Sequence, residues 1–164
     1  MPRVLILASG NPLRCDDALA WHVAQELSRL PLERDVEIIT QHQLTPELAI
    51  PVSQSETVVF LDAARTGIPG EISIEMLEPQ PACELFHSFT PAAVLGLSQE
   101  LYGTCPAAWA ISLCGECFDH GMAISPTIKN KLPQIVRWID KLARVTTSPE
   151  EQQGKASDRS GVSR

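Results

Sequence analysis

The stretch Arg3–Leu30, RVLILASGNPLRCDDALAWHVAQELSRL, joins an apolar run to a helix-like segment through a short polar turn. Val4–Ala8 is a continuous β-prone run, which is typical of a strand covered on both faces of a sheet. After the turn, apolar residues recur at helical spacing: Leu19, Val23, Leu27 and Leu30. The stretch therefore predicts a central strand followed by a helix that packs on the sheet and ends at Pro31.

The rest of the chain repeats this alternation. Further strands are predicted at Asp35–Gln41, Thr57–Leu61, Glu71–Leu77 and Ala107–Leu113, the third of them as a half-buried or edge strand. Helices are predicted after Thr45, Thr90 and Ser125, because each of these capping residues precedes a proline. The pattern predicts a single three-layer α/β/α domain with a twisted, mostly parallel five-stranded sheet.

The ends of these helices carry signals of their own. The helix after Thr45 is expected to stop near Pro51, and Gly103 is a predicted C-cap for the helix after Thr90. The last helix is expected to run from Ser125 without interruption, with a possible kink at Pro133. Residues 78–89 hold two prolines and little periodicity, so we expect a loop there.

Composition limits the classes of function. The 164 residues suffice for one domain, which we place at 1–145, and the polar residues 146–164 are expected to be a disordered tail. A net charge of -7 without a basic cluster argues against binding nucleic acid or anionic membranes. No apolar run approaches the ~20 residues that span a bilayer. We expect a monomer in the cytoplasm.

The five cysteines do not suggest a disulfide framework, because their number is odd and their spacing irregular. A reducing compartment is the simplest interpretation. Cys114-Gly-Glu-Cys117 is a CxxC pair, but it follows a late strand and has no second pair to complete a zinc site. We therefore interpret it as two small residues at a strand end, with redox or zinc chemistry as the alternative.

Parallel strands collect the loops that follow them at one edge of the sheet, where ligands bind. That edge is expected to hold Asn11–Asp17, Gln41–Gln43, Asp62 and Cys114–Cys117. Asp17 alone is read more simply as a helix cap, whereas Asp62 directly follows a buried strand and needs a partner for its charge.

His87 is a loop histidine just before a predicted helix. Two carboxylates and an imidazole would suit a divalent metal, but spacing alone does not group these three residues. Other chemistry has weak support: the sequence has no G-x-G-x-x-G loop, no Walker lysine and no G-x-S-x-G elbow.

Four segments, in this order, resemble the nickel-iron hydrogenase maturation endopeptidases: GNPLRCDDA, VVFLDA, HSFTPAAVLGLSQELYG and GMAISPTI. The match runs from about residue 3 to about residue 143. The resemblance implies an α/β fold and an aspartic-type endopeptidase that removes the C-terminal extension of a hydrogenase large-subunit precursor after nickel insertion. The cut would follow a His or Arg near the last cysteine motif of the substrate. QHQLTPELA looks closer to the branch that processes NAD-coupled bidirectional hydrogenases.

The resemblance also implies the site residues. The three metal-contacting and catalytic positions of the family fall on Asp17, Asp62 and His87. The nickel would be supplied by the precursor, and no organic cofactor is implied. The rival hypothesis is a non-catalytic α/β module that binds a nucleotide or a partner protein.

This chain departs from the family pattern at several positions. Ala8 replaces the first glycine of G-x-G-N, so the loop is expected to be less tight. Cys15 and Ala18 stand where glycines are usual, and Gln41–Gln43 replaces an acid-Gly-Gly stretch linked to substrate choice. Many members have Glu at Asp17, which leaves the adjacent Asp16 as a possible substitute ligand.

Overall fold

The computed structural model describes residues 3–32, 35–81 and 89–147. Its strands are β1 (Val4–Ser9), β2 (Val36–Gln41), β3 (Thr57–Ala64), β4 (Ile72–Met76) and β5 (Ala107–Cys114). Its α-helices are α1 (Leu19–Arg29), α2 (Ala49–Ser53), α3 (Pro91–Tyr102), α4 (Pro126–Lys129) and α5 (Leu132–Thr147). Two 3₁₀ helices, η1 (Cys15–Ala18) and η2 (Pro46–Leu48), precede α1 and α2.

The strands form one sheet in the order β2-β1-β3-β5-β4. All neighbours are parallel except β4, which pairs antiparallel with β5 at the edge. From β1 the chain moves outward to β2 and then returns to the other side of β1 to form β3. The strand order therefore reverses between β1 and β3, the place where open α/β sheets bind ligands. The predicted mostly parallel five-stranded sheet and its edge strand are confirmed.

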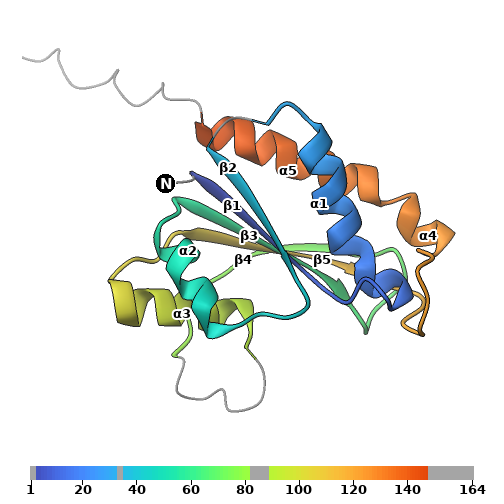
Figure 1. Ribbon diagram of the computed structural model, residues 1–164, viewed down its shortest axis with the longest axis horizontal. Helices are drawn as coiled ribbons and strands as arrows, with labels where there is room; N and C mark the ends of the chain where they lie inside the picture. The colour runs from blue at the N-terminus through green and yellow to red at the C-terminus, as the bar shows by residue number, and fades with distance from the viewer. Residues whose placement is uncertain (1–2, 33–34, 82–88, 148–164) are drawn as a thin grey trace, which may run out of the picture.

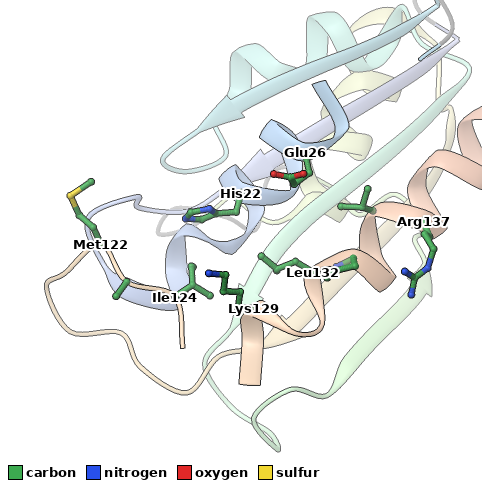
Figure 2. A pocket seen from close by; sticks show the side chains of 10 residues that line it. His22, Glu26, Met122, Ile124, Lys129, Leu132 and Arg137 are labelled. Atoms are coloured by element: carbon green, nitrogen blue, oxygen red, sulfur yellow. The ribbon is translucent and has the colours of Figure 1, made fainter. Parts of the chain in front are cut away.

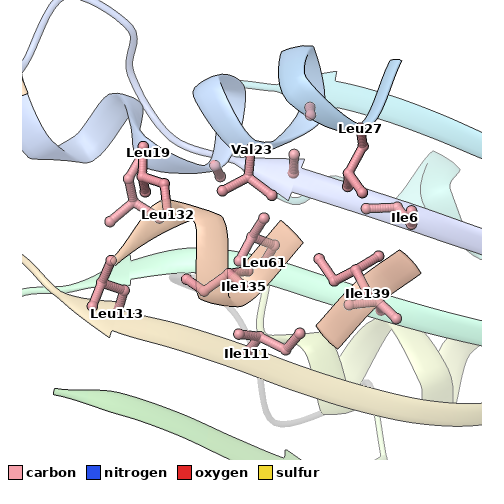
Figure 3. Close-up of a cluster of buried hydrophobic side chains, with 14 of the residues drawn as sticks. Ile6, Leu19, Val23, Leu27, Leu61, Ile111, Leu113, Leu132, Ile135 and Ile139 are labelled. Carbon is pink, nitrogen blue, oxygen red and sulfur yellow. The ribbon is translucent and has the colours of Figure 1, made fainter. Parts of the chain in front are cut away.

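Helices cover both faces of the sheet, as the three-layer prediction requires (Figure 1). The continuous apolar run of β1 is explained by alternation, since Val4, Ile6 and Ala8 face one core and Leu5 and Leu7 face the other. Helices α1 and α5 cover the first core, where large aliphatic side chains interdigitate (Figure 3). Helices α2 and α3 cover the second core.

Strand β3 is longer than predicted, which changes the place of Asp62. The sequence predicts that the strand ends before Asp62, but β3 continues to Ala64. Its pairing with β1 stops at Leu61, whereas its pairing with β5 continues through Asp62 to Ala64. Asp62 therefore lies inside a strand, at the first position where that strand has lost its β1 neighbour.

The last helical segment is two helices, so the prediction of one helix from Ser125 is wrong. Helix α4 ends at Lys129 and α5 starts at Leu132. Pro133 then falls in the first turn of α5, where its missing N–H costs no hydrogen bond, and no kink is needed. Helix α5 extends to Thr147, two residues into the predicted tail, and residues 148–164 lie outside the described residues.

The predicted helix signals have mixed outcomes. Thr90 caps α3 by accepting a hydrogen bond from the Ala93 N–H at 3.2 Å, and Gly103 ends α3 with a left-handed φ of 71°. Helix α2 is short and ends at Ser53, two residues after Pro51 and so near the predicted stop. Ser125 is the N-cap residue of α4, before Pro126 as predicted, but its hydroxyl donates to Asp16 and does not bond the helix. Among the described residues no helix has the length and apolar character to cross a bilayer.

Candidate active site

The turn after β1 is tight because it packs on itself. A Cβ at Gly10, whose φ is +147°, would lie 2.0 Å from the carbonyl oxygen of Asp17. The Gly10 carbonyl accepts a hydrogen bond from Trp21 Nε1 at 2.8 Å, and its N–H donates to the Gln41 carbonyl at 3.0 Å. Ala8 lies inside β1, so replacing the family's first glycine does not loosen the turn. Only glycine fits the close approach at Gly10.

Asp17 is not a helix cap, contrary to the simpler interpretation of the sequence. Its Oδ2 accepts a hydrogen bond from the Asn11 N–H at 2.9 Å, back across the turn. Asp17 lies in η1, one turn before α1, and its side chain is half-buried. The contact holds the carboxylate beside the C-terminal end of β1, at the reversal point of the sheet.

The neighbouring Asp16 has a different role. It is fully buried, and its carboxylate accepts four hydrogen bonds of 2.7–2.9 Å from Glu116 N, Cys117 N, Ser125 N and Ser125 Oγ. Burial alone would raise the pKa of Asp16, but these bonds favour the charged form and hold the pKa below its ordinary value. The carboxylate is committed to the loop between β5 and α4, so Asp17 is the candidate ligand.

Asp62, on β3, lies near enough to Asp17 for their charges to interact. Its side chain is reached by solvent, yet surrounding protein partly desolvates the carboxyl and raises its pKa to about 6. The negative charge of Asp17 adds to the rise, and the Ala63 N–H, at 2.7 Å from Oδ1, and the Arg65 guanidinium oppose it. Asp17 and Asp62, distant in sequence, are thus brought together closely enough to repel.

This pair of carboxylates fits a divalent cation. A bound cation would offset the repulsion between Asp17 and Asp62, which adds to desolvation in raising the Asp62 pKa. Two carboxylates together with one imidazole suit a divalent first-row metal. His87 lies outside the described residues, so its place relative to Asp17 and Asp62 stays a prediction. Within the described part of the chain, no three His, Cys, Asp or Glu side chains gather as a metal site.

The end of β2 joins the site edge, as predicted. His42 lies edge-on to Trp21, with ring centroids 5.9 Å apart, and Trp21 holds the Gly10 carbonyl. Gln41 Nε2 is buried without a hydrogen-bond partner among the described residues. A buried donor without a partner is energetically costly, and the sequence pattern alone did not reveal it.

The CxxC pair does not act as a unit. Cys114 ends β5 and is buried, whereas the Cys117 thiol contacts the Cys15 thiol, and that contact raises the pKa of Cys15. All four described cysteines are free. Cys15 has a left-handed φ of 40°, which accounts for the glycine that is usual in the family at this position.

A glycine in α3 fixes the chain before the segment that contains His87. A Cβ at Gly96 would lie 1.8 Å from the Gln80 carbonyl oxygen, so residues near Gln80 rest directly on the helix. The Gln80 N–H donates to the Ala92 carbonyl at 2.9 Å. The close approach of Gln80 and α3 therefore depends on a residue without a side chain.

Comparison with known proteins gives the fold a precedent. No protein-family model and no curated protein sequence matches the chain. Three solved structures are similar: the hydrogenase maturating endopeptidase HybD from E. coli, and the [NiFe] hydrogenase maturation proteases HycI and HybD from Thermococcus kodakarensis. Their identities are 19%, 23% and 25%, and their TM-scores 0.74, 0.70 and 0.65.

The similarity extends over nearly the whole described fold. The three alignments cover 88%, 87% and 86% of this chain and 94%, 92% and 99% of the respective structures. The fold that the four sequence segments imply is therefore the fold that the structure has. The chain has the fold of the nickel-iron hydrogenase maturation endopeptidases.

Proposed function

We propose that this chain is an endopeptidase that removes the C-terminal extension of a nickel-iron hydrogenase large-subunit precursor after nickel insertion. Its Asp17, Asp62 and His87 would contact the nickel that the precursor brings. The observation that carries the proposal is the meeting of Asp17 and Asp62 at the β1–β3 reversal point, in the fold of solved hydrogenase maturation proteases.

The electrostatics of the Asp17–Asp62 pair support recognition of a loaded precursor. Asp17 and Asp62 repel each other when both are ionised. A cation bound between them would offset this repulsion, so its binding would be favourable. A precursor without nickel would bring no charge to offset this repulsion and would bind less tightly. Cleavage would then be linked to metal insertion through binding energy alone.

Hydrolysis requires only water as the second reactant. The water oxygen forms the new C–O bond at the scissile carbonyl, the C–N bond breaks, and the amine of the released extension takes up a proton. Asn11, whose N–H holds Asp17 and whose Oδ1 accepts a hydrogen bond from the Leu13 N–H at 2.9 Å, keeps the loop in position beside the bound peptide.

The test is incubation of the purified chain with nickel-loaded and nickel-free precursor, followed by intact-mass measurement. Loss of a C-terminal peptide from the loaded precursor alone is the expected result. Using precursors of an NAD-coupled bidirectional hydrogenase and of another hydrogenase class also tests the branch inferred from QHQLTPELA.

The alternative, a non-catalytic binding module, makes the opposite prediction. Such a module would bind the loaded precursor, or a nucleotide, and leave every mass unchanged. Binding without cleavage, with nickel verified in the precursor, would therefore overturn the peptidase proposal.

A further inference from the structure

A pocket lies between α1 and the α4–α5 segment (Figure 2). Its volume is about 610 Å³, within the range of binding pockets in general. The floor is apolar and continues the main core: Ile124, Leu132 and Val136 all pack against the cluster under α1. A pocket with such a floor favours an apolar side chain of a ligand.

The rim of this pocket is charged unevenly. Lys129 of α4 and Arg137 of α5 are exposed and form no ion pair with any residue that the structure describes. On the α1 side Glu26 is paired with Arg29, and His22 lies one turn earlier (Figure 2). In a chain of net charge -7, this rim is a local positive patch.

An exposed apolar strip connects the pocket to the proposed active site. Met122, on the pocket rim, is 76% exposed, and Leu13, in the Asp17 loop, is 57% exposed. The two segments are paired, because the Gly121 N–H donates to the Leu13 carbonyl at 2.9 Å and the Cys15 N–H to the Gly121 carbonyl at 2.8 Å. A ligand that covers both side chains must be longer than the pocket itself, which favours a polypeptide.

We infer that this surface, defined by the pocket together with Leu13 and Met122, is an exosite for the precursor. It binds an apolar segment of the precursor that carries an acidic side chain, at a distance from the scissile bond. The inference rests on the proposed peptidase function and deepens it by adding a second contact with the same substrate. The acidic side chain pairs with Lys129 and Arg137, and the apolar side chains cover Leu132, Val136 and Met122.

The first experiment measures processing kinetics of nickel-loaded precursor with the double variant Lys129→Glu/Arg137→Glu. The expected result is a KM roughly five- to tenfold higher with unchanged kcat, because two exposed attractions become repulsions away from the reacting groups. The matched control is Lys131→Glu/Lys141→Glu, which changes the net charge equally on exposed residues that do not line the pocket. An unchanged KM in the first double variant, or an equal rise in both, overturns the exosite.

A filled pocket gives an independent test. Ala123→Trp, at an exposed position on the rim, is expected to raise KM without a change in the thermal midpoint of unfolding. Normal KM in a folded variant counts against the exosite. If wild-type protein cleaves no loaded precursor, the proposed function fails and the exosite with it. If wild type cleaves and the variants match it, only the exosite fails.

A probe pair separates the charge from the apolar floor. Anilinonaphthalene sulfonate has two aromatic ring systems and one negative charge, and N-phenylnaphthylamine has the same rings without the sulfonate. Lys129→Glu/Arg137→Glu should weaken binding of the charged probe roughly fivefold and leave the neutral probe unaffected. Ala123→Trp should weaken both probes. Equal binding of both probes to all variants contradicts a ligand site of this chemistry.

Discussion

Asp16 and Asp17 are adjacent in sequence, but their carboxylates have different surroundings and different partners. Asp16 is buried under four hydrogen bonds from the loop between β5 and α4, which hold its pKa down. Asp17 accepts one hydrogen bond from an N–H of its own turn, and its charge adds to the desolvation that raises the pKa of Asp62. Asp16 anchors the loop between β5 and α4, whereas Asp17 is a residue of the proposed nickel-contacting site and repels the charge of Asp62. Stability and function are thus divided between two neighbouring carboxylates.

The largest expected effect comes from removing a charge on the functional side of this comparison. Asp17→Asn and Asp62→Asn should each reduce processing of loaded precursor by about 100-fold or more, since changes in even the outer shell of metal sites cost 10–100-fold. Intact mass over time measures the loss, and urea unfolding checks that both variants are folded. Near-normal processing by a folded variant would remove that residue from the site.

Substitution of Asp16 should lower the stability of the folded protein. Asp16→Ala leaves three backbone N–H groups and one hydroxyl without their acceptor, so we expect the free energy of unfolding to fall by about 3 kcal/mol. Chemical denaturation measures this difference. If Asp16→Ala unfolded at the wild-type urea concentration, the anchoring role assigned to Asp16 would be wrong.

Ser125→Ala sharpens the same point with a smaller change. It removes only the hydroxyl that donates to Asp16 at 2.8 Å and keeps the three backbone donors. We expect a loss of about 1 kcal/mol in the free energy of unfolding and near-normal processing. A loss as large as that of Asp16→Ala would mean that the Ser125 hydroxyl alone accounts for the stability that Asp16 contributes, and that the three backbone donors add little.

The smallest expected effect is on the pH dependence of stability in the metal-free protein. Asp16 and Asp62 change the free energy of unfolding in opposite directions as pH rises. The pKa of Asp16 is lowered on folding, so its contribution to stability is present above its ordinary pKa of 3.8 and is lost as pH falls. The pKa of Asp62 is raised to about 6, so folding favours its protonated form. The stability that Asp62 contributes is lost as pH rises from its ordinary 3.8 to about 6.

Denaturation of wild type and Asp62→Asn across this pH range checks the sign. The stability of wild type should decrease relative to Asp62→Asn as pH rises toward 6 and then stay level. Parallel curves for the two proteins would show that the Asp62 carboxyl is not perturbed in the folded state.

Much of the fold was predictable because the residues that the local pattern marks as apolar are the ones that tertiary packing buries. The apolar run of β1, the amphipathic α1 and the Thr90-Pro91 start of α3 each bury the side that the pattern indicates. The predictions failed where long-range contacts decided the outcome. β3 extends past Asp62 because β5 continues beside it, and the Ser125 side chain, although at the N-cap of α4, donates its hydroxyl to Asp16.

The candidate site divides in the same way. Resemblance to a family selected Asp17 and Asp62, and the structure adds that their charges interact across the β1–β3 reversal point. The separation of Asp16 from Asp17 was not predictable, because both are acids in the same 3₁₀ turn and only the partners of each side chain distinguish them. The partners of Asp16 lie about 100 positions later in the chain, whereas Asp17 is bonded by Asn11 of its own turn.

By itself, the sequence determined the three-layer architecture, the central place of Val4–Ala8 and the loops that carry the acids, because hydrophobic periodicity and turn chemistry are local properties. Only the tertiary structure decided which acid is buried, how far β3 extends, and where the charged pocket between α1 and α5 forms. These features depend on contacts between segments distant in the chain, and burial, pKa and pocket shape arise from such contacts.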